Sequence, residues 1–271
     1  MTDFQKGSSD QTRLTAKARA WLLGVAGAIL AIAFWAGMAA WLRGGGGAIS
    51  RLPDPASVAV ELANYARGAL WRDLFASLQV FVAGWAIGTV LATVVGLMIG
   101  RSRVVAGLLS PVIEAIRPVS SIAWVPLAVV WFGFGFTSKA FLVGLAVFLV
   151  VIVYAIDGSR RIPPDLARTA AMLGMTPLQR FQALILPGAL TEVLIGARVA
   201  LMAGWGTVIV AELVAADSGL GAHLIAMQQS YDVAAVMAAM VCFGVAGFVM
   251  NGIFSRLETW LLPWRPREVA R

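Results

Sequence analysis

The chain has 271 residues, of which 60% are hydrophobic and 13% are charged, and its mean hydropathy is +0.84. Soluble domains average about 45–50% apolar and about 25% charged residues. This composition therefore excludes an ordinary soluble protein and predicts an integral membrane protein. The formal net charge of +7 is compatible with nucleic-acid binding, but the basic residues flank apolar runs, which is typical of membrane topology. The lone Cys242 lies in an apolar run and cannot form an internal disulfide.

Six apolar runs are long enough to cross the hydrocarbon core of a membrane, which requires about 20 helical residues. They cover residues 21–42, 74–100, 104–134, 139–156, 188–213 and 233–254. The first is too long for the apolar region of a signal peptide and is predicted to be a retained span. Pro118 and Pro126 interrupt the third, which leaves open whether it forms one helix or two. The predicted fold class is all-α integral membrane, with about six transmembrane helices.

Six spans place both termini on the same side of the membrane, and the charges indicate which side. Fourteen Lys and Arg residues lie in tails and loops on the face that carries the termini, and five lie on the other face. The positive-inside rule predicts that the face with fourteen is cytoplasmic. The expected order is a cytoplasmic tail (1–20), a first span (21–42), an outer segment with an amphipathic helix (43–73), a core (74–256) that contains a cytoplasmic loop (157–187), and a cytoplasmic tail (257–271).

The loop at 157–187 carries clear helix signals. A proline pair followed by Asp165 favours a helix start, and Gly174 favours its end. Thr176 fits a capping box with the glutamine three residues on, and a proline stands at the first position of that second helix. We expect two short helices joined at the glycine, the second ending before Pro187, where the fifth span opens. The loop is either a connector at the membrane surface or a docking element for another protein.

The same loop resembles the EAA loop of binding-protein-dependent ABC transporter permeases. In that motif E-A-A, three residues, Gly, nine residues and I-x-L-P follow one another. The residues at matching positions or in the helix signals are Arg168, Thr169, Ala170, Ala171, Gly174, Thr176, Pro177, Leu184, Leu186 and Pro187. Arg168 stands where the family has glutamate, and Thr169 stands where it has the first alanine. The helix–glycine–helix pattern does not depend on that glutamate.

Two longer stretches extend the resemblance. "IRPVSSIAWVPLAVVWFGFG" and "ILPGALTEVLIGARVALMAGWGTVIVAELVAADSGLG" are similar to the taurine, alkanesulfonate and nitrate branch of that family, and aromatic acid importers are similar too. The likeness covers roughly residues 50–265. It implies the type I ABC importer permease fold and a permease subunit that moves a small anion of sulfonate, nitrate or carboxylate type across the bacterial cytoplasmic (inner) membrane.

The resemblance also implies the partners. They are a second permease copy, as a homodimer or a heterodimer, two cytoplasmic ATPase subunits that dock on the loop, and a periplasmic or lipid-anchored substrate-binding protein. ATP and Mg would belong to the ATPase, and no cofactor is expected in this chain. The sequence contains no G-x-x-x-x-G-K-[ST] motif and no Cys/His cluster for a metal, so no enzyme activity of its own is expected. A secondary transporter without an ATPase is the alternative; such folds often have inverted repeats, and none is evident.

Ionisable residues inside the spans are candidates for the translocation pathway, because they are costly in lipid and face the protein interior or a water-filled route. The pathway candidates, with their neighbours, are Arg117, Pro118, Trp124, Trp131, Arg198 and Glu212. Proline at 118 predicts a helix break, and the guanidinium beside it offers paired donors to an anion. Structural ion pairs are the alternative, for Arg117 with a carboxylate such as Glu114 or Glu212.

Glycine spacing and the single histidine allow two smaller predictions. Gly84 with Gly88, and Gly96 with Gly100, form two G-x-x-x-G spacings in the second span, which indicate close helix packing. The partner helix belongs either to this chain or to a second copy. His223 is predicted to lie in an outer loop as an ordinary loop residue rather than a metal ligand.

Overall fold

The computed structural model describes residues 22–27, 29–42, 52–215 and 218–261, and within these ranges every regular element is a helix. The labelled helices are α2 (Pro55–Arg67), α3 (Leu70–Arg101), α4 (Arg103–Ile116), α5 (Val125–Phe132), α6 (Phe136–Arg160), α7 (Pro164–Met172), α8 (Pro177–Arg180), α9 (Leu186–Ala215), α10 (Leu220–Gln229) and α11 (Val233–Leu261). The predicted tail at 1–20, residues 43–51 of the outer segment and residues 262–271 lie outside the described residues.

By length and composition, five of the described helices can cross a membrane, or six spans if one bent helix pair counts as a span. The five are Leu22–Leu42, Leu70–Arg101, Phe136–Arg160, Pro177–Val214 and Val233–Trp260. The bent pair is Arg103–Ile116 with Ser121–Phe132. The predicted all-α membrane fold with about six spans is confirmed, and the chain is a multi-pass membrane protein.

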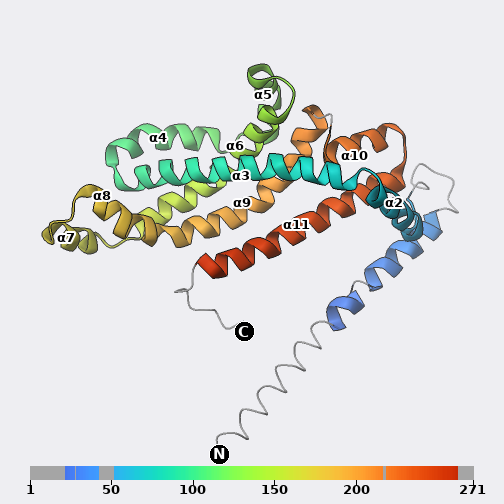
Figure 1. The fold of residues 1–271 in the computed structure, drawn as a ribbon, viewed down its shortest axis with the longest axis horizontal. Helices are drawn as coiled ribbons and strands as arrows, with labels where there is room; N and C mark the ends of the chain where they lie inside the picture. Colours follow the sequence, from blue (N-terminus) through green and yellow to red (C-terminus); the bar gives the residue numbers. More distant parts are fainter. Residues whose placement is uncertain (1–21, 28, 43–51, 216–217, 262–271) are drawn as a thin grey trace, which may run out of the picture.

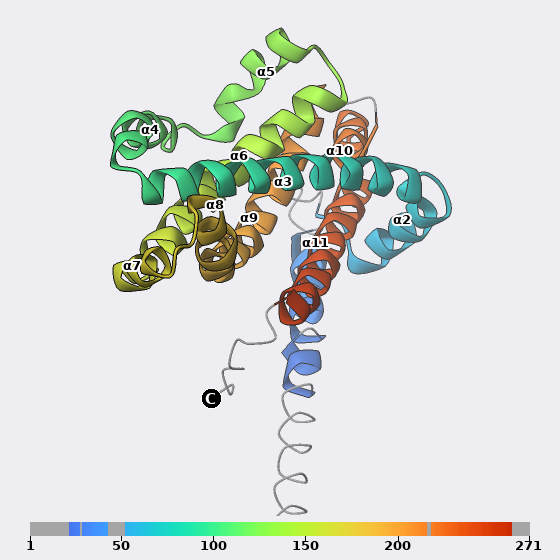
Figure 2. The same ribbon diagram turned by 60° about the vertical axis from the view of Figure 1, so that its left-hand side comes forward.

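The centre of the bundle consists of α3, α6 and α9, with α6 packed between the other two (Figures 1 and 2). Val143, Val147 and Val151 are fully buried, because residues four apart on α6 lie on one helix face. Trp205 of α9 meets Phe81 of α3 edge to face, with 5.6 Å between ring centroids. These contacts make α3, α6 and α9 the frame on which the remaining elements are placed.

The contact between α3 and α6 depends on the glycines of the two G-x-x-x-G spacings. A Cβ on Gly88 would lie 2.4 Å from the carbonyl oxygen of Gly144, and one on Gly96 would lie 2.5 Å from the Cβ of Ala155. Backbones this close leave no room for a larger residue. The spacings therefore serve helix packing within the chain. The alternative, that this face contacts a second copy, is wrong because α6 occupies it.

The predicted third span is two helices joined by a sharp bend. α4 ends at Ile116, a 3-10 turn covers Ser121–Trp124, and the two parts of the span make an angle of 94°. Proline has no amide hydrogen and clashes with the preceding helical turn, so the helix breaks at Arg117–Pro118 as predicted. Pro126 stands in the first turn of α5, where a missing amide hydrogen costs nothing.

The two ends of the bundle carry different elements (Figure 1). α7 and α8 lie at one end, which we call the loop end. α2 and α10 lie at the opposite end, which we call the α10 end. α2 begins behind Asp54, whose carboxylate accepts a hydrogen bond from the amide of Ser57 at 3.3 Å, and it packs mainly against α11. This helix lies within the outer segment where an amphipathic helix was expected.

Candidate functional site

The loop between α6 and α9 has the local geometry that its sequence predicts. α7 is followed by Gly174, whose φ of +77° is a left-handed conformation that favours glycine. The amide of Thr176 donates to Gln179 Oε1 at 2.8 Å, and the amide of Gln179 donates to Thr176 Oγ1 at 3.3 Å. Both halves of the capping box are present, and Pro177 opens α8. Such a cap typically contributes about 0.5–2 kcal/mol to helix stability.

The end of the loop differs from the prediction. We expected the second short helix to end before Pro187, but α8 continues through a π-helical turn at Phe181–Ile185 directly into α9. The amide of Leu186 donates to the carbonyl of Phe181, five residues back. The π turn widens the helix just before Pro187, where an ordinary turn would place the proline ring against a carbonyl. Residues 177–214 therefore form one continuous helical run.

Arg168 lies on the exposed side of α7, at the position where the EAA motif has glutamate. Its guanidinium is 3.3 Å from the carboxylate of Asp165, one turn earlier, and both side chains are largely exposed. An exposed pair of this kind contributes little to stability. Thr169 donates to the carbonyl of Asp165 at 2.9 Å, and Ala170 is buried. Of the motif's later residues, Leu184 is half-buried in the π turn, and Leu186 and Pro187 open α9.

The tip of the loop exposes apolar side chains. Leu166, Met172, Leu173 and Leu178 are between 51% and 80% exposed. Beside them lies a hollow of about 440 Å³, lined by Leu173, Gly174, Met175, Gln179, Gln182 and Ala183. The base of the loop is fixed differently, by an ion pair between Arg161 at the end of α6 and Glu192 of α9. The loop is thus anchored at its base and apolar at its tip.

Arg117 is exposed at the break after α4. It lines a hollow of about 170 Å³ against α6, together with Glu114, Asp157 and Arg160 among others. Within the described residues Arg117 forms no ion pair, so the alternative pairing with Glu114 or Glu212 is not present. Its guanidinium is therefore available in a small hollow that two carboxylates also line. Pro118 follows it and is exposed as well.

The two tryptophans predicted near Arg117 lie in different elements and contact different residues. Trp124, in the 3-10 turn, packs on a small cluster that includes Val125 and Ala128, and its Nε1 is buried without a hydrogen-bond partner. Trp131, in α5, is 57% exposed and meets the ring of Phe141 at 6.1 Å between centroids. The structure gives no contact that joins either ring to Arg117 within the described residues.

Arg198 has a partner that the sequence did not suggest. Its Nη1 lies 3.2 Å from Oε2 of Glu258, so the ion pair links α9 to α11. The two residues are 60 positions apart in the chain, and no local pattern relates them. Glu258 lies inside the predicted C-terminal tail at 257–271, which α11 enters as far as Leu261. Arg198 therefore has a structural partner within the chain, and its place on the translocation pathway stays a prediction.

Glu212 is 2% exposed near the end of α9. It accepts hydrogen bonds from the hydroxyl of Ser77 in α3, at 2.7 and 2.9 Å, and from the amide of Gly221 at 2.8 Å. Within the described residues it makes no ion pair and no hydrogen bond to Arg117 or Arg198. The six pathway candidates are thus not brought together at one point. Sequence reasoning missed Ser77, since a lone serine in an apolar span carries no positional signal.

An aromatic stack joins α2 to α10 nearby. The rings of Tyr65 and His223 lie 3.8 Å apart and are inclined by 5°. The hydroxyl of Tyr65 donates to Asp73 at 3.1 Å, and burial together with the negative charge of Asp73 raises the pKa of Tyr65. Burial lowers the pKa of His223. The prediction that His223 lies in a loop is wrong: it belongs to α10.

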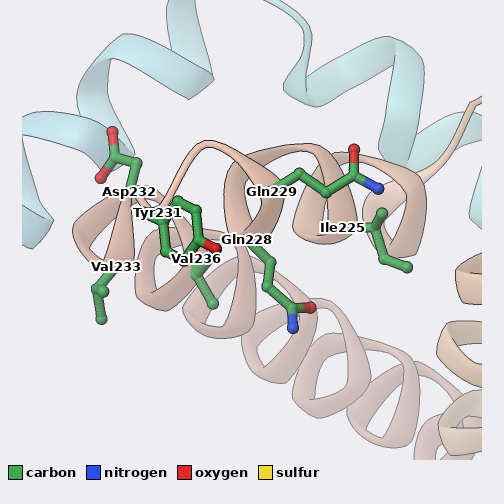
Figure 3. Close-up of a pocket in the computed structure, with 7 residues that line it drawn as sticks. All are labelled: Ile225, Gln228, Gln229, Tyr231, Asp232, Val233 and Val236. Carbon is green, nitrogen blue, oxygen red and sulfur yellow. The ribbon is translucent and has the colours of Figure 1, made fainter.

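The turn from α10 to α11 borders a hollow of about 510 Å³ (Figure 3). Its lining residues are Ile225, Gln228, Gln229, Tyr231, Asp232, Val233 and Val236. Tyr231 has a φ of 57°, unusual for a residue other than glycine, and its side chain is 80% exposed. Asp232 caps α11 by accepting from the amide of Ala235 at 3.0 Å. The α10 end therefore presents an aromatic and amide-bearing surface.

Comparisons with known proteins agree with this architecture. The family model described as "Binding-protein-dependent transport system inner membrane component" matches residues 88–265. The taurine transport system permease protein TauC of Escherichia coli (strain K12) is 35% identical over 219 residues, which is 79% of this chain and 80% of that protein. The putative aliphatic sulfonates transport permease protein SsuC of Bacillus subtilis (strain 168) is 31% identical over 90% of this chain and 88% of that protein.

One further relative and one solved structure are also similar to this chain. The bicarbonate transport system permease protein CmpB of Synechococcus elongatus is 29% identical over 79% of this chain and 81% of that protein. Among solved structures, an inward-facing conformation of the MetNI methionine ABC transporter superposes with a TM-score of 0.61 at 18% identity. That match covers 70% of this chain and 94% of the solved chain, and it concerns the fold alone.

Proposed function

Since this chain belongs to the family of binding-protein-dependent transport system inner membrane components, we propose that it is the translocation subunit of an ATP-driven importer for a small anion. The observation that carries the proposal is the capped helix–Gly174–helix loop, held at one end of a bundle of five or six spans. The transported anion is of the sulfonate, nitrate or carboxylate type, which includes bicarbonate. The relatives named for taurine, aliphatic sulfonates and bicarbonate support this class.

The loop is the proposed docking site for a partner ATPase. Leu173 and Leu178 expose apolar surface that water disfavours, and a hollow of about 440 Å³ lies beside them. The sequence has no phosphate-cradling motif, so ATP and Mg belong to the partner. The exposed Arg168 replaces the usual glutamate and fits an acidic position on the ATPase surface better than a basic one. A substrate-binding protein would deliver the anion to the α10 end.

Docking can be tested by cysteine cross-linking. The chain's single cysteine, Cys242, is buried, so an introduced thiol at an exposed position reacts selectively. Leu173→Cys should cross-link to cysteines on the partner ATPase. Tyr231→Cys, equally exposed at the opposite end, is the matched control and should not. If no position between 164 and 180 cross-links while the complex is intact, the docking proposal is wrong.

The loop end is proposed to face the cytoplasm of a bacterial cell, with both termini on that side. The support is the sequence, in which the predicted face that carries the termini and this loop has fourteen Lys and Arg residues against five on the other face; the positive-inside rule assigns the richer face to the cytoplasm. The α10 end then faces the periplasm and the binding protein. Membrane insertion with a reporter fused after Leu261 tests the orientation.

A second copy of this chain is the proposed partner within the membrane. Val104, Leu108 and Val112 follow one another at intervals of four along α4 and are 53% to 72% exposed. No residue of α4 is buried in the single described chain. One helix face of apolar side chains that its own chain leaves uncovered supports contact with a second copy. Mass measurement of the purified complex tests the homodimer against a heterodimer.

Transport itself is tested in proteoliposomes. The complex of this chain, its ATPase and its binding protein should accumulate labelled anion only when ATP is supplied inside. Taurine, methanesulfonate, nitrate and bicarbonate are suitable probes, each with the binding protein present and absent. Uptake that proceeds without the ATPase and follows an ion gradient would overturn the proposal in favour of a secondary transporter.

A further inference from the structure

The amino end of α10 is held by side chains from two other helices. The hydroxyl of Ser77, in α3, donates to the carboxylate of Glu212 and accepts from the amide of Leu220 at 2.9 Å. The second oxygen of Glu212 accepts from the amide of Gly221 at 2.8 Å. We call this network of Ser77, Glu212 and the amides of Leu220 and Gly221 the α10 clasp. It joins α3, α9 and α10 at one point.

The clasp caps the amino end of α10 in place of an ordinary N-cap side chain. The first amides of a helix have no partner within the helix, and a Ser, Thr, Asp or Asn at the N-cap usually binds one of them. The N-cap of α10 is Gly219, which has no side chain to do so. Ser77 and Glu212 bind the first two amides of α10 instead. A carboxylate at this position also interacts favourably with the helix dipole.

The backbone around the carboxylate is shaped to receive it. Gly219 has a φ of +119°, and a Cβ there would lie 2.3 Å from an oxygen of Glu212. A Cβ on Gly221 would lie 2.7 Å from the Cβ of Glu212. Both Ser77 and Glu212 are at most 2% exposed. The two glycines leave room for the carboxylate of Glu212 beside the amides of α10. A buried carboxylate without hydrogen-bond partners is strongly unfavourable, so this contact stabilises the position of Glu212.

The clasp lies at one end of a helix whose other end is the loop. The helical run of α8, the π turn and α9 continues from Pro177 to Val214. Its 38 residues extend about 57 Å at the usual helical rise. A displacement of the loop end can therefore reach the clasp through one continuous helical run, which includes the π turn.

We propose that Glu212 is a positioning residue for transport: through the clasp it makes α10 move together with α9. The inference rests on the proposed function. Nucleotide-driven movement of the loop end would then shift α10, and with it the turn that carries Gln228 and Tyr231 (Figure 3). Glu212 would act on the α10 end by holding a helix rather than by touching the transported anion. This differs from the pathway role that the sequence suggested.

Hydrogen–deuterium exchange on the full complex in nanodiscs tests the proposal. It compares the nucleotide-free complex with the complex trapped by ATP and vanadate. Peptides that contain Leu220 and Gly221 report on the clasp, and peptides from 164–180 report on the loop. In the unaltered protein both regions should change exchange on trapping. If the loop does not respond, the proposed ATPase docking fails; if the loop responds and α10 does not, the clasp proposal fails.

Two variants sharpen the test. Ser77→Ala and Glu212→Gln should each speed exchange at the start of α10 about tenfold, because a buried hydrogen bond is lost. They should also remove the response of α10 to nucleotide while the loop still responds. Ser138→Ala is the matched control, since Ser138 is as buried but donates to Gly135 within its own helix region. A full α10 response in both clasp variants would overturn the proposal.

Discussion

Arg198 of α9 and Glu258 of α11 form an ion pair with 3.2 Å between Nη1 and Oε2. The arginine side chain is 43% exposed, so solvent screens it, and we expect the pair to contribute about 1 kcal/mol to stability. Arg198→Met should lower the unfolding temperature of the purified protein by about 2–4 °C. The variant Glu258→Gln and the double variant complete a double-mutant cycle, which measures the coupling between the two side chains. Losses that simply add in the double variant would show that the two side chains are not coupled.

Gly174 should be required for coupling rather than for insertion. Its φ of +77° disfavours other residues, yet nothing lies within 4 Å of a Cβ built there, so a side chain has space. Gly174→Leu should strain the turn by about 1–2 kcal/mol and misplace α7 against α8. We expect normal membrane insertion and continued ATP hydrolysis, but anion uptake reduced severalfold. Gly174→Asn, which tolerates this conformation, should keep most uptake; equal loss in both variants would contradict the argument.

Local patterns predicted much of this molecule well. The six apolar runs predicted the membrane fold, and Thr176 with Gln179 predicted a capping box that the structure contains. The loop motif and its flanking stretches predicted the family and its taurine and sulfonate branch, which the comparisons confirm. These features depend on residues close together in the chain, where helix geometry relates spacing to position.

The remaining features depend on contacts that spacing does not encode. Ser77 and Glu212 are 135 residues apart, and Arg198 and Glu258 are 60 apart, so only the packing of α3, α9 and α11 brings them together. The prediction that the second short helix ends before Pro187 was wrong for a different reason. A proline usually opens or breaks a helix, and the π turn that admits it here has no simple sequence signature.

His223 should make stability depend on acidity. Burial lowers its pKa below the ordinary value of 6.5, against the smaller opposing effect of Asp73. A folded pKa below the unfolded one means that the folded state favours neutral His223. This stability is present above about pH 6.5 and is lost as the pH falls through the folded pKa. Between pH 7 and pH 5, the unfolding temperature of the unaltered protein should therefore drop more than that of the His223→Phe variant. Phenylalanine keeps an aromatic ring stacked on Tyr65 but cannot be protonated. Identical pH dependence in the two proteins would refute this.

Arg117 should be needed for transport but not for assembly. It is exposed beside a helix break and forms no ion pair within the described residues, so its paired donors are available to an anion. Arg117→Ala should cut uptake of the transported anion at least about tenfold, as expected when hydrogen bonds to a charged group are lost. Arg117→Lys should recover only part, because lysine keeps the charge and loses the fork. Arg103→Ala is the control, because Arg103 is the first residue of α4, at the opposite end from Arg117, and is also exposed. An Arg117→Ala complex that dissociates in detergent would instead assign the residue a structural role.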